Sequence, residues 1–126
     1  MNKRLYGLRG ASGAENTKES IQKGVTDMCR ALFADNKLSP DDIVSIHFTL
    51  TRDLTALNPA FALRHGDTGI DVSNCALFAS QEAYIENSPT GMIRVLVHAY
   101  MEEGSKPKHA YVNGGEKLRP DFARKL

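Results

Sequence analysis

Arg94 is the residue whose position in this sequence most strongly suggests chemistry. It lies inside the apolar run 92–97, where a charge costs free energy unless a partner neutralises it. In an extended strand His98 and Tyr100 would share its face, so that face is expected to line a polar cavity. Glu82, which follows an expected strand, is the candidate partner. From residue types alone a structural Glu82–Arg94 ion pair is favoured, and a ligand site is the alternative.

Other arginines and one tyrosine are weaker candidates. Arg9 is expected where a strand runs into a glycine-containing turn, a frequent place for binding residues, although an exposed arginine is the commoner interpretation. Arg64 ends a short expected helix, whose C-terminal dipole would attract it. Tyr111 and Arg119 fit an ordinary strand and an ordinary C-terminal turn. Together, arginines, one carboxylate and a tyrosine suit recognition of a small anion, because guanidinium groups bind carboxylates in a bidentate geometry.

Several classes of function are disfavoured by what the sequence lacks. It has no GxSxG, no P-loop, no GxGxxG in the proper context and no convincing nucleophile set. Cys29 and Cys75 have no CxxC spacing and the four histidines form no HExxH pattern, so no disulfide framework and no metal site are expected. Sixteen Lys and Arg against 15 Asp and Glu leave a net charge of +1, which argues against a nucleic-acid partner. No segment resembles a membrane span or a signal peptide, so we expect a cytoplasmic protein.

The pattern of apolar residues predicts the elements that must hold these side chains. Residues 21–33 carry a single apolar helical stripe, which Asn16 with Glu19 would open as a capping box and Asn36 would close. In the strand 43–50, Val44, Ile46, Phe48 and Leu50 are expected on one face, and Ile43, Ser45, His47 and Thr49 on the other. The remaining expected elements are strands 5–11, 71–78, 92–101 and 110–112 and a short helix 60–65.

This order of elements predicts an α+β fold, an α/β-like sandwich in which one long and one short helix cover a mixed sheet. The length, 126 residues, indicates a single domain, 1–126. One main helix leaves the other face of such a sheet exposed. Pairing that face with further copies of the chain would bury it and create clefts between subunits. We therefore expect a small oligomeric enzyme or binding protein.

Seven short segments, read in order, resemble the monofunctional, trimeric chorismate mutases with a pseudo-α/β-barrel. Each motif is weak, but their joint order and spacing extend over nearly the whole chain. The matching segments are Gly7-Leu8-Arg9-Gly10-Ala11, Thr51-Arg52-Asp53-Leu54-Thr55-Ala56, Asn58-Pro59-Ala60-Phe61-Ala62-Leu63-Arg64, Gln81-Glu82, Ile93-Arg94-Val95, His109-Ala110-Tyr111 and Leu118-Arg119-Pro120-Asp121.

The resemblance implies a reaction and a set of roles. Chorismate would be converted to prephenate by a Claisen rearrangement in aromatic amino-acid biosynthesis, without a cofactor, in clefts between the subunits of a homotrimer. Arg94 would contact the ether oxygen and a carboxylate, Arg9 would bind a carboxylate, and Glu82 would accept a hydrogen bond from the ring hydroxyl. The substrate-binding residues implied are Tyr111, the wall segment Phe78, Ala79, Ser80 and Gln81, and the peripheral Arg64 and Arg119.

Two alternatives remain open at this point. One is an enamine/imine deaminase, a family of related trimeric fold that also uses an arginine at a cleft between subunits. The other is a non-catalytic trimer that binds a carboxylate metabolite. The second alternative is suggested by Asn58, where the mutases usually have an aromatic residue, and by Phe61, which replaces a usual basic residue.

Overall fold

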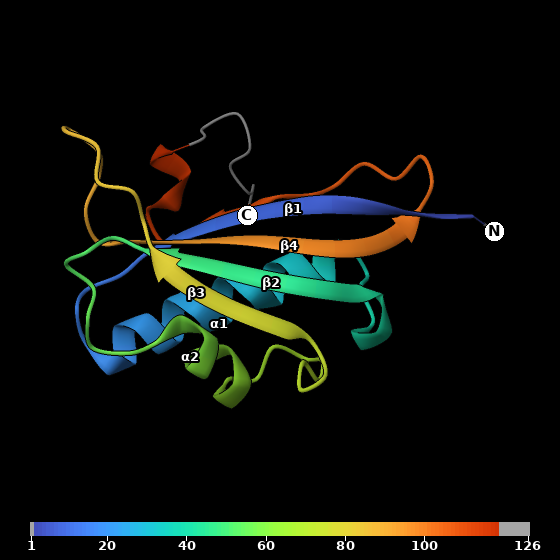
Figure 1. The fold of residues 1–126 in the computed structure, drawn as a ribbon, viewed down its shortest axis with the longest axis horizontal. Coiled ribbons are helices and arrows are strands. Elements are labelled where there is room, and N and C mark those ends of the chain that lie inside the picture. The colour runs from blue at the N-terminus through green and yellow to red at the C-terminus, as the bar shows by residue number, and fades with distance from the viewer. Residues whose placement is uncertain (1, 119–126) are drawn as a thin grey trace.

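A five-stranded mixed sheet carries both helices on one of its faces (Figure 1). The computed structural model describes residues 2–118. The strand order across the sheet is β3-β2-β4-β1-β5, with β1 antiparallel to β4 and parallel to β5. The elements are β1 (Lys3–Gly13), α1 (Lys18–Asp35), η1 (Pro40–Asp42), β2 (Ile43–Leu50), α2 (Pro59–His65), β3 (Ala76–Gln81), β4 (Met92–Glu102), β5 (Ala110–Val112) and η2 (Gly115–Lys117).

The helix α1 confirms the predicted apolar stripe but not its predicted start. Its buried side chains pack with the covered face of the sheet in one core, which includes Phe48. Thr17, not Asn16, is the N-cap and accepts a hydrogen bond from the Ser20 N–H at 3.1 Å. Asn16 instead accepts hydrogen bonds from two backbone N–H groups of the loop after β2, at 2.8 Å each. Asn36 ends the helix as predicted.

Three strands, β2, β1 and β3, differ in part from the sequence-based expectation. A bulge between Ile43 and Ser45 buries Ile43 and exposes Val44, which reverses the predicted faces at the start of β2. The expected turn at residues 10–13 is wrong, because β1 continues to Gly13 between β4 and β5. Gly10 is needed there for space: a Cβ would lie 2.9 Å from the Ala110 carbonyl oxygen. The expected strand 71–78 begins only at residue 76 and runs on to residue 81.

The face of the sheet opposite the helices, which we call the open face, is covered by neither α1 nor α2. Strand pairing arranges its side chains in rows across the sheet. One row holds Arg9, Leu96, His47 and Phe78, and the next holds Ala11, Arg94, Thr49 and Ser80. As predicted, His98 and Tyr100 share the face of Arg94. The exposed large apolar side chains of this face include Leu5, Phe78 and Tyr100.

Candidate active site on the open face

The Glu82–Arg94 ion pair expected from the residue types is present on the open face. Arg94 Nη1 lies 3.2 Å from Glu82 Oε2, and the Thr49 hydroxyl donates a hydrogen bond to Oε1 of the same carboxylate. The Glu82 N–H donates to the Leu50 carbonyl at 2.8 Å, which continues the β2–β3 ladder by one residue and fixes the position of Glu82. The Arg94 side chain is 44% exposed. Because a guanidinium has five N–H donors, this ion pair leaves donors available to a ligand.

A pocket of about 270 Å³, which we call the central pocket, lies beside this ion pair. Strands β1, β2, β4 and β5 all contribute to it, so side chains far apart in the sequence meet there. It is lined by Arg9, Gly10, His47, Thr49, Glu82, Arg94, Val95, Leu96 and Tyr111. The structure thus brings together the three residues expected to be catalytic and one of those expected to bind substrate.

Arg9 and Tyr111 reach the central pocket from adjacent strands. Arg9 lies inside β1 rather than at a strand end, and its backbone N–H donates to His109 Nδ1 at 3.0 Å. Tyr111 pairs in register with Ala11 on the open face and is only 2% exposed. The Tyr111 side chain packs in a small apolar cluster with Ala11 and Met92. The sheet therefore presents two cationic side chains and a phenol to one cavity.

The expected wall segment is divided between the two faces of β3. Phe78 and Ser80 are on the open face, where the Phe78 ring contacts His47 and the Ser80 hydroxyl lies 2.9 Å from His47 Nε2. Ala79 faces the opposite way and packs against the core, and Gln81 is exposed at the end of the strand. Phe78 is 66% exposed. Within one chain, none of these four residues lines the central pocket.

The two peripheral arginines are not brought to this pocket by the described part of one chain. Arg64 is exposed in the last turn of α2, on the helix-covered side of the sheet. Arg119 lies outside the described residues. The residue Asn58, in the same segment as Arg64, is the N-cap of α2 and accepts hydrogen bonds from the N–H groups of Ala60 and Phe61. Its local role is therefore structural.

A second pocket, of about 350 Å³, adjoins the first across the ion pair. Glu82 and Arg94 line both pockets. The far wall of the second pocket carries Tyr84, whose ring centre lies 3.9 Å from the Arg52 guanidinium carbon. Asp53 accepts hydrogen bonds from the Gly91 N–H and so ties the turn after β2 to the start of β4. Burial acts to raise the pKa of Asp53, but bonds from Thr51 and Gly91 outweigh it and hold that pKa below its ordinary value.

Sequence reasoning gave no site role to Thr49 and His47. The alternation of β2 correctly assigns both to its polar face. Their pairing opposite Arg94 and Leu96 depends on the register between β2 and β4, which no local pattern reveals. Thr49 matters most, because its hydroxyl orients one oxygen of Glu82 while Arg94 orients the other.

Residues 2–118 contain neither a candidate membrane-spanning helix nor a candidate metal-ligand cluster. No helix in this range combines the length and the apolar character needed to cross a membrane. Nor do three or more His, Cys, Asp or Glu side chains in it group as they would around a metal ion.

Comparison with known proteins places this geometry in a family. The chain is 29% identical to chorismate mutase AroH of Thermus thermophilus over 121 residues, covering 94% of this chain and 96% of that protein. It is 27% identical to chorismate mutase AroH of Bacillus subtilis (strain 168) over 123 residues, with 94% and 93% covered.

A solved structure and a family model agree with these relatives. The chorismate mutase structure from Clostridium thermocellum matches with a TM-score of 0.81 and 34% sequence identity, covering 90% of this chain and 99% of that one. The sequence model of chorismate mutase type I matches residues 5–122. The chain therefore belongs to the chorismate mutase type I family and is an isomerase of aromatic amino-acid biosynthesis.

Proposed function

We propose that this enzyme rearranges chorismate to prephenate in the central pocket, with Arg94 as the principal catalytic residue. The observation that carries the proposal is the meeting of Arg94, Glu82, Arg9 and Tyr111 around one cavity on the open face. Chorismate is a dianion, and two arginines that project from rigid strands suit the binding of its carboxylates. The reaction is intramolecular, so it needs neither a nucleophile nor a cofactor.

Arg94 acts on the charge that develops during the rearrangement. Breaking of the C–O bond places partial negative charge on the ether oxygen. A guanidinium held beside that oxygen stabilises the transition state more than the bound substrate, which is the condition for raising kcat. The ion pair with Glu82 keeps the guanidinium in place before the substrate arrives, so little reorganisation is needed at the moment of reaction.

Glu82, Arg9 and Tyr111 hold the substrate in its reactive shape. The carboxylate of Glu82 is oriented by Thr49 on one oxygen and by Arg94 on the other, and it retains lone pairs for the ring hydroxyl of chorismate. Arg9 binds a carboxylate from the neighbouring strand, and Tyr111 contacts the substrate from β5. Fixing a flexible substrate in a near-attack geometry lowers the entropic part of the barrier.

The proposal includes a homotrimer whose open faces form a pseudo-α/β-barrel with active sites between subunits. The exposed apolar side chains Leu5, Phe78 and Tyr100 of the open face support it, since such groups gain free energy when another subunit covers them. Arg64 lies on the other side of the sheet from Arg94 of its own chain. In the trimer we assign the segment 78–81 to the wall of the site and Arg64 and Arg119 to its periphery, with Arg64 supplied by the neighbouring subunit.

Light scattering tests the assembly. We expect the mass of three chains at micromolar protein concentration. A Phe78→Asp variant is expected to shift the protein towards single chains, because it places a carboxylate on the part of the open face that another subunit would cover. A monomeric mass for the unaltered protein at that concentration would contradict the trimer.

We further propose that residues 1–126 form a single chorismate-mutase-like domain and that the protein is cytoplasmic. Both cysteines are free, with Cys29 buried and Cys75 half-buried. Free thiols are typical of a reducing compartment.

The activity is tested by incubating the purified protein with chorismate and following the loss of its ultraviolet absorbance. We expect first-order loss with prephenate as the sole product, and loss of the catalysed rate in an Arg94→Ala variant. If chorismate binds but disappears no faster than the thermal background, the non-catalytic trimer is the correct interpretation. Any product other than prephenate would favour a different enzyme, such as the deaminase alternative.

A further inference from the structure

Tyr111 stands in the middle of a short strand at the edge of the sheet. The strand β5 has three residues and pairs with β1, and a hydrogen bond of 3.1 Å from the Gly13 N–H to the Asn113 carbonyl extends this contact. Tyr111 lines the central pocket, and residues 111–113 also border a third pocket of about 420 Å³ beside α1, which we call the outer pocket. The ring is buried against Ala11 of β1 and Met92 of β4. Because Tyr111 belongs to β5, the path of this strand helps to set where the ring lies.

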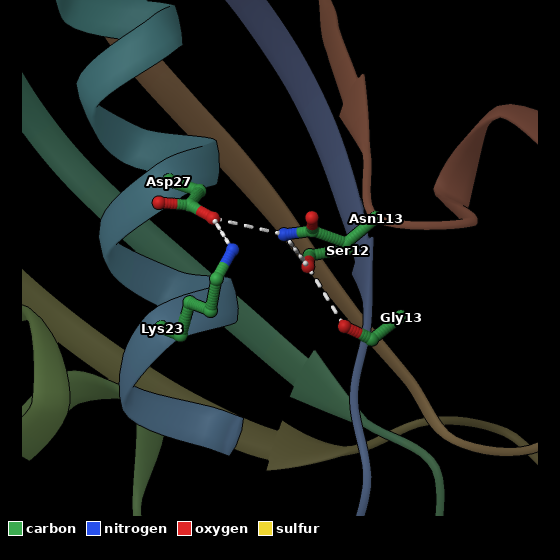
Figure 2. Close-up of polar contacts among 5 residues, drawn as sticks. All are labelled: Ser12, Gly13, Lys23, Asp27 and Asn113. Atoms are coloured by element: carbon green, nitrogen blue, oxygen red, sulfur yellow. Dashed lines mark hydrogen bonds and ion pairs between the residues drawn. The ribbon is translucent and has the colours of Figure 1, made fainter. Parts of the chain in front are cut away.

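A polar cluster joins the downstream end of β5 to both β1 and α1 (Figure 2). The side-chain amide of Asn113 donates one hydrogen bond to Ser12 Oγ and one to Asp27 Oδ2, at 3.2 Å each. The Ser12 hydroxyl donates in turn to the Gly13 carbonyl at 2.9 Å, and Lys23 Nζ lies 2.6 Å from Asp27 Oδ2. We call Ser12, Asp27 and Asn113 the Asn113 clamp.

The clamp is built so that few other residues could replace Asn113. Its backbone has φ 51°, a left-handed conformation that asparagine and aspartate adopt more readily than most residues. Both amide hydrogens are used, and one of their acceptors, Ser12, is fully buried. Burial acts to raise the pKa of Asp27, but hydrogen bonds from Lys23 and Asn113 outweigh it, so the pKa lies below its ordinary value. Asp27 therefore stays ionised at neutral pH and accepts a charge-assisted bond.

The upstream end of β5 is held separately. Asn36, which ends α1, exchanges two hydrogen bonds of 2.8 Å with the backbone of Lys108, and the Arg9 N–H donates to His109 Nδ1. These contacts fix where β5 begins. The Asn113 clamp and the hydrogen bond from the Gly13 N–H to the Asn113 carbonyl hold the chain where it leaves β5, two residues beyond Tyr111.

We propose that the Asn113 clamp is a positioning device that holds the Tyr111 side chain against the substrate. The inference rests on the proposed role of Tyr111 in the central pocket. The clamp lies outside that pocket and connects α1 and β1 to the end of β5, and its integrity controls how well Tyr111 contacts the substrate. Asn113, Asp27 and Ser12 act through Tyr111 and are not themselves in contact with the central pocket.

The sharpest variant is Asn113→Asp, which keeps the shape and the tolerance of positive φ but loses both donors. It also places a carboxylate against Asp27, so the clamp opens. We expect kcat/KM to fall about tenfold, which is less than the roughly 10² that a 1 Å misplacement can cost. The matched control is Asn87→Asp, another exposed asparagine with positive φ (66°), which lines none of the three pockets. Its kcat/KM is expected to change less than about twofold.

Two double variants distinguish a positioning role of Asn113 from a general loss of stability. The double variant Asp27→Asn with Asn113→Asp restores the hydrogen bond with donor and acceptor exchanged, so it should recover most of the lost kcat/KM. In a Tyr111→Phe background, Asn113→Asp should cost almost nothing further, because the hydroxyl that the clamp positions is gone. No rescue, or a full tenfold loss in both backgrounds, would overturn the inference.

The same set of variants distinguishes failure of the inference from failure of the proposed function. If Tyr111→Phe has the activity of the unaltered enzyme, the proposed role of Tyr111 is wrong and the clamp has nothing to position. If Tyr111→Phe is impaired and Asn113→Asp is not, the role of Tyr111 stands and the clamp inference alone is wrong.

Discussion

The two faces of the sheet are built from the same strands but filled by different chemistry. On the helix-covered face, alternate residues of β2 and β4 such as Phe48 and Val95 are buried against α1 and α2. On the open face, the residues between them include Thr49 and Arg94, which carry polar groups or charge and surround the central pocket. A period-two pattern thus separates stability from chemistry within one strand, because neighbouring residues point to opposite sides.

The largest expected change is in the free energy of unfolding, and it results from a substitution on the helix-covered face. Phe48→Ala should lower the free energy of unfolding by about 3–5 kcal/mol, because it leaves a cavity in the core. The kcat measured well below the new melting temperature should stay close to that of the unaltered enzyme. Thermal unfolding and steady-state kinetics check both halves, with Phe48→Leu as the milder control. A large fall in kcat in the folded Phe48→Leu variant would break the separation between the faces.

The converse variant lies on the open face. Glu82→Gln removes the charge that pairs with Arg94 and accepts from Thr49. We expect kcat/KM to fall by about 10- to 150-fold, which corresponds to the roughly 1.5–3 kcal/mol of a hydrogen bond to a charged group. The melting temperature should change little, since the pair is partly exposed. A Glu82→Gln variant that lost stability but kept its activity would contradict the catalytic role proposed for Glu82.

The smallest expected effect lies far from the pocket, where Lys3 on β1 contacts Asp42 of η1 at 2.5 Å. Hydrogen bonding to Lys3 is the main cause that lowers the pKa of Asp42. A carboxyl with a lowered folded-state pKa stabilises the fold above its unfolded pKa, and this contribution is lost as the pH falls below about 4. Asp42→Asn should therefore cost only about 0.2–1 kcal/mol at pH 7 and flatten the acid limb of the stability curve.

Chemical denaturation between pH 2 and pH 7 checks the Asp42 prediction, and kinetics at pH 7 provide its control. Activity should be unchanged, because this ion pair lies at the start of β1, and neither Lys3 nor Asp42 lines the central pocket. An acid limb as steep as that of the unaltered protein would show that Asp42 is not the group responsible.

The sequence predicted the covered face better than the open one. Burial imposes a regular pattern, so the helical stripe of α1 and the alternation of β4 could be read directly, and the order of elements is confirmed. The predicted family and α+β class are confirmed as well. The bulge after Ile43 was missed because the pairing of β2 with β4 creates it, and no local propensity marks it.

The site was predictable where a residue violated the pattern around it. Arg94 stands out as a charge within an apolar strand, and that anomaly led to Glu82. The expected setting of Arg9 is wrong, because its glycine-rich neighbourhood indicates a turn, whereas Gly10 and Gly13 are needed for close packing of β1 against neighbouring backbone. Thr49 was missed because only the register between two strands places it against Glu82.

The central claim is that the Arg94 guanidinium stabilises the transition state rather than simply binding the substrate. The most direct test is the kcat of Arg94→Lys at saturating chorismate, measured on protein shown to be folded. A single ammonium cannot reproduce the planar donor set, so we predict that kcat falls by about 10²–10³. A variant that keeps kcat within a few-fold and raises only KM would contradict the claim.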